Sequence, residues 1–74
     1  MNGLMKKKVY TSDGEFVGKI KEIIFKGNRI DSLRIELNKI MKKKIKIKGI
    51  SLKYKHIENI GQIVIVDKKI LDRL

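Results

Sequence analysis

The sequence predicts an all-β protein, a small and partly open β-barrel of about six short strands. A hairpin signal, Asp13-Gly14, stands between two β-forming segments near the start of the chain. β-Branched and aromatic residues dominate residues 19–25, and residues 32–37 alternate strictly between apolar and polar side chains. Gly49 interrupts a later alternating segment, where a bulge or corner lets a small sheet curl into a barrel.

The length of the chain indicates a single domain of low stability. A chain of 74 residues buries only about 60% of the surface that its unfolded form exposes, so we expect it to form a homodimer. The absence of cysteine excludes disulfides and thiolate metal sites, and it indicates a reducing compartment. No segment has the roughly 20 apolar residues of a membrane-spanning helix, so a cytoplasmic location is expected. Residues 1–6 are predicted to be a flexible leader and residues 7–74 the domain.

The net charge is the most unusual feature of the composition. Nineteen Lys and Arg residues against eight Asp and Glu residues give a formal charge of +11. Such a field attracts nucleic acid, anionic membrane surfaces and acidic proteins, all with salt-dependent affinity. The alternative is that the preference for Lys reflects genome composition or heat adaptation, with no partner involved.

The first half of the chain is predicted to contain three strands, over residues 7–11, 17–25 and 32–37. Asp13 and Gly14 form the first turn, and Gly18 is expected where the backbone of the second strand closely approaches a neighbour. Alternation breaks at residues 22–24, which indicates either a bulge or a strand covered on both faces. Gly27-Asn28 then predicts the second turn.

The second half is less regular. Residues 38–44 are predicted to be a loop or a strand extension anchored by Ile40 and Met41, followed by an alternating strand from Lys44. Ile57 and Ile60 have the spacing of a helical turn within residues 54–60, and residues 62–67 suit a strand with both faces covered. The last residues predict a short helix that packs on the barrel or on a second chain. Its apolar stripe supplies the candidate dimer contacts, Ile70, Leu71 and Leu74.

Five segments carry a resemblance to a known family: residues 9–10, 12–15, 17–20, 33–37 and the closing segment 51–67. Their order resembles the PRC-barrel domain, a small β-barrel of photosynthetic reaction centres and of a ribosome-maturation factor. The resemblance extends from about residue 7 onward and is most specific for short stand-alone archaeal members. Only the segment 38–48 departs from it, because it is more basic than the family pattern. The resemblance implies a non-catalytic adaptor or assembly module, with cell division as the role of the archaeal forms.

The sequence contains no motif of a catalytic, metal or cofactor site. His56 is the only histidine, so no zinc ligand set can form around it, and no G-x-S-x-G motif surrounds the nearby Ser51. Gly18-Lys19 is similar to the end of a phosphate-binding loop, but Ile20 replaces the required Ser or Thr. These residues are more simply explained as turn, strand and surface positions, and no enzyme activity is expected.

A run of lysines is the remaining candidate site. Alternation within a predicted strand would place these side chains on a ridge along one face. Few aromatic residues interleave with them, which favours a protein partner over base-specific recognition of nucleic acid. The alternatives are a ribosome-associated or nonspecific RNA-binding protein, and an edge strand whose lysines only prevent aggregation. The candidate interaction surface comprises Lys42, Lys43, Lys44, Lys46 and Lys48.

Overall fold

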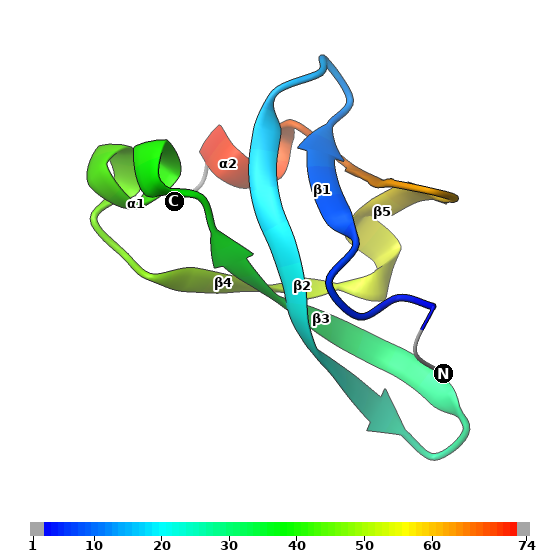
Figure 1. Ribbon diagram of the computed structural model, residues 1–74. Coiled ribbons are helices and arrows are strands. Elements are labelled where there is room, and N and C mark those ends of the chain that lie inside the picture. Colours follow the sequence, from blue (N-terminus) through cyan, green and yellow to red (C-terminus); the bar gives the residue numbers. More distant parts are fainter. Residues whose placement is uncertain (1–2, 73–74) are drawn as a thin grey trace.

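Six β-strands form one sheet in the computed structural model, which describes residues 3–72 (Figure 1). The strands lie in the order β4-β3-β2-β1-β6-β5, and every neighbouring pair is antiparallel except β1 and β6. β4 and β5, at the two ends of this order, are not paired with each other, so the predicted fold class, a partly open barrel, is confirmed. The strands are β1 (Lys8–Thr11), β2 (Phe16–Lys26), β3 (Arg29–Leu37), β4 (Gly49–Lys53), β5 (Ile57–Ile60) and β6 (Val64–Val66). The helical elements are α1 (Lys39–Ile45), the 3-10 turn η1 (Tyr54–His56) and α2 (Lys69–Asp72).

The predicted first hairpin is present between β1 and β2. The Gly14 N–H donates to the Thr11 carbonyl at 2.9 Å, and Gly14 has φ +90°, a conformation that residues with a Cβ rarely adopt. The Thr11 hydroxyl is buried at the base of the turn. It accepts the Glu15 N–H at 2.9 Å and donates to the Asp13 carboxylate. The turn is therefore held by a buried side chain in addition to its glycine.

The β2–β3 hairpin is the longest feature and extends beyond the body of the barrel (Figure 1). Its register shifts between Ile20 and Glu22, which explains the break in alternation as a bulge. Gly27 has φ +60° and forms the tip, as predicted. β3 alternates as the sequence indicates, with one face of the strand buried and the other exposed. The strand begins three residues earlier than predicted, at Arg29.

Gly18 lies where the backbones of β2 and β3 are close together. A Cβ built on Gly18 would stand 1.9 Å from the Glu36 carbonyl oxygen and 2.9 Å from the Glu36 carbonyl carbon. Both are backbone atoms in the middle of a paired sheet, so they cannot move aside as a flexible side chain would. The close approach predicted for Gly18 is confirmed.

The prediction for residues 38–48 is wrong, because a helix replaces the expected loop and strand. Asn38 caps α1 through its side-chain oxygen, which accepts the Met41 N–H at 2.9 Å. Its amide nitrogen donates to the carbonyls of Phe16 at 2.7 Å and Val17 at 3.1 Å, so the cap also ties the helix to β2. Met41 is buried as predicted, whereas Ile40 is 76% exposed and anchors nothing.

Lys46 ends the helix in the left-handed conformation at φ 66°, and its N–H donates to the Lys42 carbonyl. The next strand, β4, begins only at Gly49. A bulge or a corner is predicted at Gly49. The β3–β4 register is regular along its length, so the bulge is wrong, and Gly49 is the first residue of β4. A Cβ there would lie 2.8 Å from the Ile35 carbonyl oxygen, and close approach explains this glycine.

The segment 54–60 is helical only in its first half. η1 covers Tyr54–His56, and β5 then follows, so Ile57 and Ile60 lie on a strand rather than on one helical turn. Pairing with β6 explains the difference, because the ladder joins Ile60 to Val64 across a tight connection. The closing strand itself is confirmed, but shorter than predicted.

A single cluster of apolar side chains fills the barrel. It contains residues of all strands except β5, together with Met41 of α1 and Ile70 of α2. Leu4 packs against it from the N-terminal side, and the Lys6 N–H donates to the Ile20 carbonyl at 3.0 Å. Packing contacts therefore begin within the segment predicted to be a flexible leader.

Candidate interaction surface

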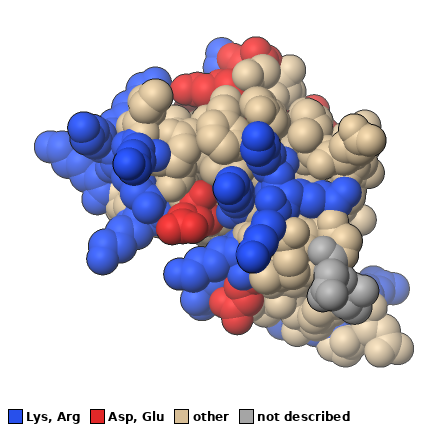
Figure 2. Space-filling model, in the orientation of Figure 1, with Lys and Arg blue, Asp and Glu red and all other residues tan. Residues whose placement is uncertain are grey.

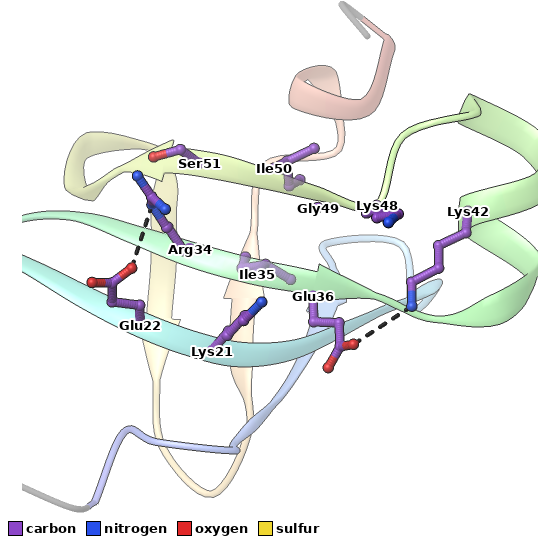
Figure 3. A pocket seen from close by; sticks show the side chains of 10 residues that line it. All are labelled: Lys21, Glu22, Arg34, Ile35, Glu36, Lys42, Lys48, Gly49, Ile50 and Ser51. Atoms are coloured by element: carbon purple, nitrogen blue, oxygen red, sulfur yellow. Dashed lines mark ion pairs between the residues drawn. The ribbon is translucent and has the colours of Figure 1, made fainter.

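A shallow groove runs across the outer face of β2, β3 and β4 (Figure 3). Its volume is about 410 Å³. Its charged side chains alternate away from the core, the core residues Ile35 and Ile50 also line it, and α1 closes one end through Lys42. The lining residues are Lys21, Glu22, Arg34, Ile35, Glu36, Lys42, Lys48, Gly49, Ile50 and Ser51.

Charges of both signs alternate in this groove. The Arg34 guanidinium lies 3.5 Å from the Glu22 carboxylate, and the Lys42 ammonium lies 3.5 Å from the Glu36 carboxylate (Figure 3). Exposed pairs of this kind contribute about 0–1 kcal/mol each, so they shape the surface more than they stabilise the fold. Within residues 3–72, Lys21 forms no ion pair, and its ammonium is free to meet a partner.

The five lysines of the predicted interaction surface do not form a ridge on one strand. Lys42, Lys43 and Lys44 lie on α1, where consecutive residues are about 100° apart and point in different directions. Lys42 and Lys48 reach the groove, while Lys44 pairs with Glu15 at 3.7 Å. The predicted ridge of lysines along one strand is therefore wrong, because α1 takes the place of the expected loop and strand.

Figure 2 shows the result on the surface. Lys and Arg side chains gather over α1 and again across the strands, with acidic side chains between the two groups. The sequence placed Arg34 and Glu36 on the solvent face of a strand but gave no reason to join them to residues of other elements. Strand register brings Glu22 of β2 next to Arg34, and the position of α1 brings Lys42 next to Glu36. A cross-strand charge pattern was the only available signal.

The residues predicted to form a dimer contact lie in different surroundings. Ile70 is only 9% exposed and belongs to the core of its own chain. Leu71 packs partly buried against that core. Leu74 lies outside the described residues. The dimer stays a prediction. Of the two described candidates, Leu71 is more exposed than Ile70.

A second groove follows the free edge of β4. Its volume is about 340 Å³, and its apolar lining includes Ile47 and Ile70. His56 also lines it, and within the described residues its Nδ1 atom has no hydrogen-bond partner. Across residues 3–72, no group of three or more His, Cys, Asp or Glu side chains is arranged to hold a metal ion.

One carboxylate is electrostatically perturbed, at the tip of the first hairpin. The Thr11 hydroxyl donates to Asp13, and the Lys68 ammonium lies 3.4 Å from the same carboxylate. Both interactions favour the ionised form and lower the pKa of Asp13 below its ordinary value of 3.8. Because its partners are a turn hydroxyl and a surface lysine, this perturbation belongs to the structure of the hairpin.

The fold and this surface define a class of protein: a small open β-barrel that presents one charged groove and one largely apolar groove. The sequence matches the family model of the PRC-barrel domain over residues 3–71, and the chain belongs to this family. No curated protein matches the sequence closely enough to be counted as a relative. None of the helices in residues 3–72 is long and apolar enough to cross a membrane.

Proposed function

We propose that this PRC-barrel protein is a non-catalytic adaptor that binds a protein partner through the groove on the outer face of β2, β3 and β4. The mixed charge of the groove carries this proposal. Glu22 and Glu36 stand among Lys21, Arg34 and Lys42, so the surface offers donors and acceptors side by side. Protein interfaces are complementary in just this way, with charges of both signs fixing the register between partners.

The same carboxylates disfavour the alternative, a nucleic-acid surface. A phosphate backbone is attracted by unopposed positive charge, and each carboxylate beside it would be repelled. Two of the five lysines predicted to form the surface are paired with glutamates, Lys42 with Glu36 and Lys44 with Glu15. These observations support a protein partner over ribosomal RNA, although the net charge of +11 would still speed association with any acidic surface.

The cellular setting belongs to the same proposal. The resemblance to short archaeal members of the family supports a role in assembling the division machinery in an archaeal cytoplasm. Homodimer formation is part of this proposal, because a 74-residue domain gains stability from any interface that covers apolar surface. Exposed apolar side chains are available for it, among them Phe25 at 46% and Ile40 at 76%.

The experiment that tests the proposal reverses one charge inside the groove. The tagged protein is used to capture partners from native lysate at 50 and 200 mM salt, alongside Lys21→Glu. Lys21 lines the groove and forms no ion pair within the described residues, so its reversal removes an attraction without breaking an internal contact. We expect the variant to lose a protein that the parent retains at both salt concentrations.

Lys26→Glu is the matched control. Lys26 is an exposed residue of the same strand, at the tip of the β2–β3 hairpin and outside the groove. Both variants change the net charge by the same amount, so a purely long-range field would weaken capture equally. Equal loss in the two variants, or recovery of RNA alone, would refute the groove as a protein-binding site.

A further inference from the structure

The free edge of β4 has a defined hydrogen-bonding pattern. The Leu37 N–H donates to the Lys48 carbonyl at 3.2 Å, and the register continues from this pair to Ile35 with Ile50. In an antiparallel ladder, residues that exchange hydrogen bonds alternate with residues that do not. Ile50 therefore bonds to β3, as does Leu52 two residues later.

The remaining residues of β4 direct their backbone groups the other way. Gly49, Ser51 and Lys53 stand at the positions whose N–H and C=O groups point away from β3. Among the described residues, no backbone group outside the ladder bonds to them. The edge is thus an unsatisfied template for one more strand.

The second groove lies along this edge. An added strand would run about 4.8 Å from β4, and its alternate side chains would face the groove. The lining there is largely apolar, with Ile47 at 40% exposure, Ile50 and Leu52 from β4, and Ile70 from α2. The edge therefore combines backbone pairing, which supplies affinity, with a side-chain pocket, which supplies selectivity.

Charge identifies the occupant. Residues 46–55, which span β4 and its two flanks, contain four lysines and no carboxylate. Lys53 pairs with Asp31 of β3 at 3.5 Å, whereas Lys46, Lys48 and Lys55 form no ion pair within residues 3–72. A segment with carboxylates at its ends would meet lysines on both sides of the edge. A second copy of this chain would instead bring the same lysines against their own equivalents, which disfavours pairing of β4 with β4.

We propose that β4 binds an extended acidic segment of the partner by strand addition, with apolar side chains of that segment in the groove beside Ile47 and Ile70. This inference rests on the proposed function, because it supplies the way in which a protein partner is held. The outer-face groove and the β4 edge then form two neighbouring parts of one docking surface, sharing Gly49, Ile50 and Ser51.

A defined peptide tests the inference with the whole protein. The probe alternates Val and Thr over six residues and carries two Glu at each end, with capped termini; its counterpart replaces every Glu with Lys. Amide hydrogen exchange is followed by NMR at 50 mM salt. We expect the acidic peptide to slow exchange at Gly49, Ser51 and Lys53 at least tenfold, with little change at Ile50, whose N–H is already bonded. The basic peptide should bind at least tenfold more weakly.

Ser51→Pro isolates the backbone contribution. Proline removes an N–H that points outward from an edge strand, so the bonds to β3 are kept. We expect it to weaken binding of the acidic peptide at least tenfold, while Ser51→Thr, which keeps the N–H, binds like the parent. If the proline variant does not fold, the exchange pattern of the parent protein still decides the question.

Three results would overturn the inference: no binding at 1 mM peptide, slowed exchange confined to the outer-face groove, or protection of the β4 edge by protein concentration alone. The last result would assign the edge to a second copy. Failure here differs from failure of the proposed function. If Lys21→Glu abolishes capture of the native partner while Ser51→Pro does not, the adaptor function stands and strand addition at β4 is wrong.

Discussion

Replacing Gly18 with alanine should be the most damaging single-methyl change in this protein. The new Cβ would lie 1.9 Å from the Glu36 carbonyl oxygen, whereas contacts of this kind are rarely below 3.0 Å. The two strands would have to separate by about 1 Å while each is paired on its other side. Overpacking in a well-packed interior costs about 1–3 kcal/mol, and each weakened ladder hydrogen bond adds about 1 kcal/mol.

The expected loss is therefore about 3 kcal/mol or more, a large share of the roughly 4–11 kcal/mol available to a domain of this length. Urea unfolding followed by far-ultraviolet circular dichroism measures it. Two other glycines provide a graded series, since a Cβ would be 2.8 Å from a carbonyl oxygen at Gly49 and 4.0 Å at Gly61. We expect the order Gly18→Ala, Gly49→Ala, Gly61→Ala from most to least destabilised. Equal stability of the Gly18 and Gly61 variants would refute the close-approach argument.

Three further predictions concern the cap, the first hairpin and the assembly state. Asn38→Ala should destabilise by about 1–2 kcal/mol in thermal unfolding, because it removes the helix cap and the donors to β2, while Asn38→Ser keeps a cap acceptor and should lose less. The folded-state pKa of Asp13 lies below its ordinary value, so the ionised carboxylate stabilises the fold above about pH 4, and this stabilisation is lost as the pH falls through the lowered pKa. Asp13→Asn should therefore reduce the dependence of the unfolding free energy on pH in the acid range. The homodimer should appear in light scattering at micromolar concentration, with a melting temperature that rises with protein concentration; Leu71→Glu should reduce both effects, and a concentration-independent monomer would contradict the dimer.

Local turn chemistry accounts for the parts of the fold that the sequence predicts well. Asp13-Gly14 and Gly27-Asn28 define their hairpins through residues adjacent in the chain, and the alternation of residues 33–37 assigns the buried face of β3. Gly18 was also correct, because glycine inside a strand pattern signals a close backbone approach. These features depend on a few neighbouring residues, which is why a single sequence contains them.

The prediction for the segment after Asn38 is wrong, although the sequence contains the helix signals. Alternation of Ile and Lys over residues 44–48 indicates a strand, but Asn38 is a favourable helix cap and Lys is a good helix former. Met41 and Ile45, four residues apart, pack one side of α1 against the core. The alternating pattern led to the prediction of a strand, whereas in the structure the helix cap and the packing of Met41 and Ile45 favour a helix.

The candidate surface could be predicted only in part. Lys42 and Lys48 line the outer-face groove, yet Glu22 and Glu36 decide its character, and they enter through β2–β3 register and the placement of α1. Net charge alone suggested an unopposed basic surface. Ion pairs between different elements, which no local pattern reveals, give part of this basic surface a mixed charge.

The most direct test of the adaptor proposal is the binding of RNA as a function of salt. Fluorescence anisotropy with a labelled single-stranded RNA of mixed sequence is measured at 50 and 200 mM salt, with the parent and with a variant in which Gln replaces Lys42, Lys43, Lys44, Lys46 and Lys48. The adaptor account predicts weak binding by the parent and a partner complex that 200 mM salt weakens only modestly. Tight RNA binding by the parent that falls steeply between the two salt concentrations, and that disappears in a folded glutamine variant, would contradict the account and assign the surface to nucleic acid.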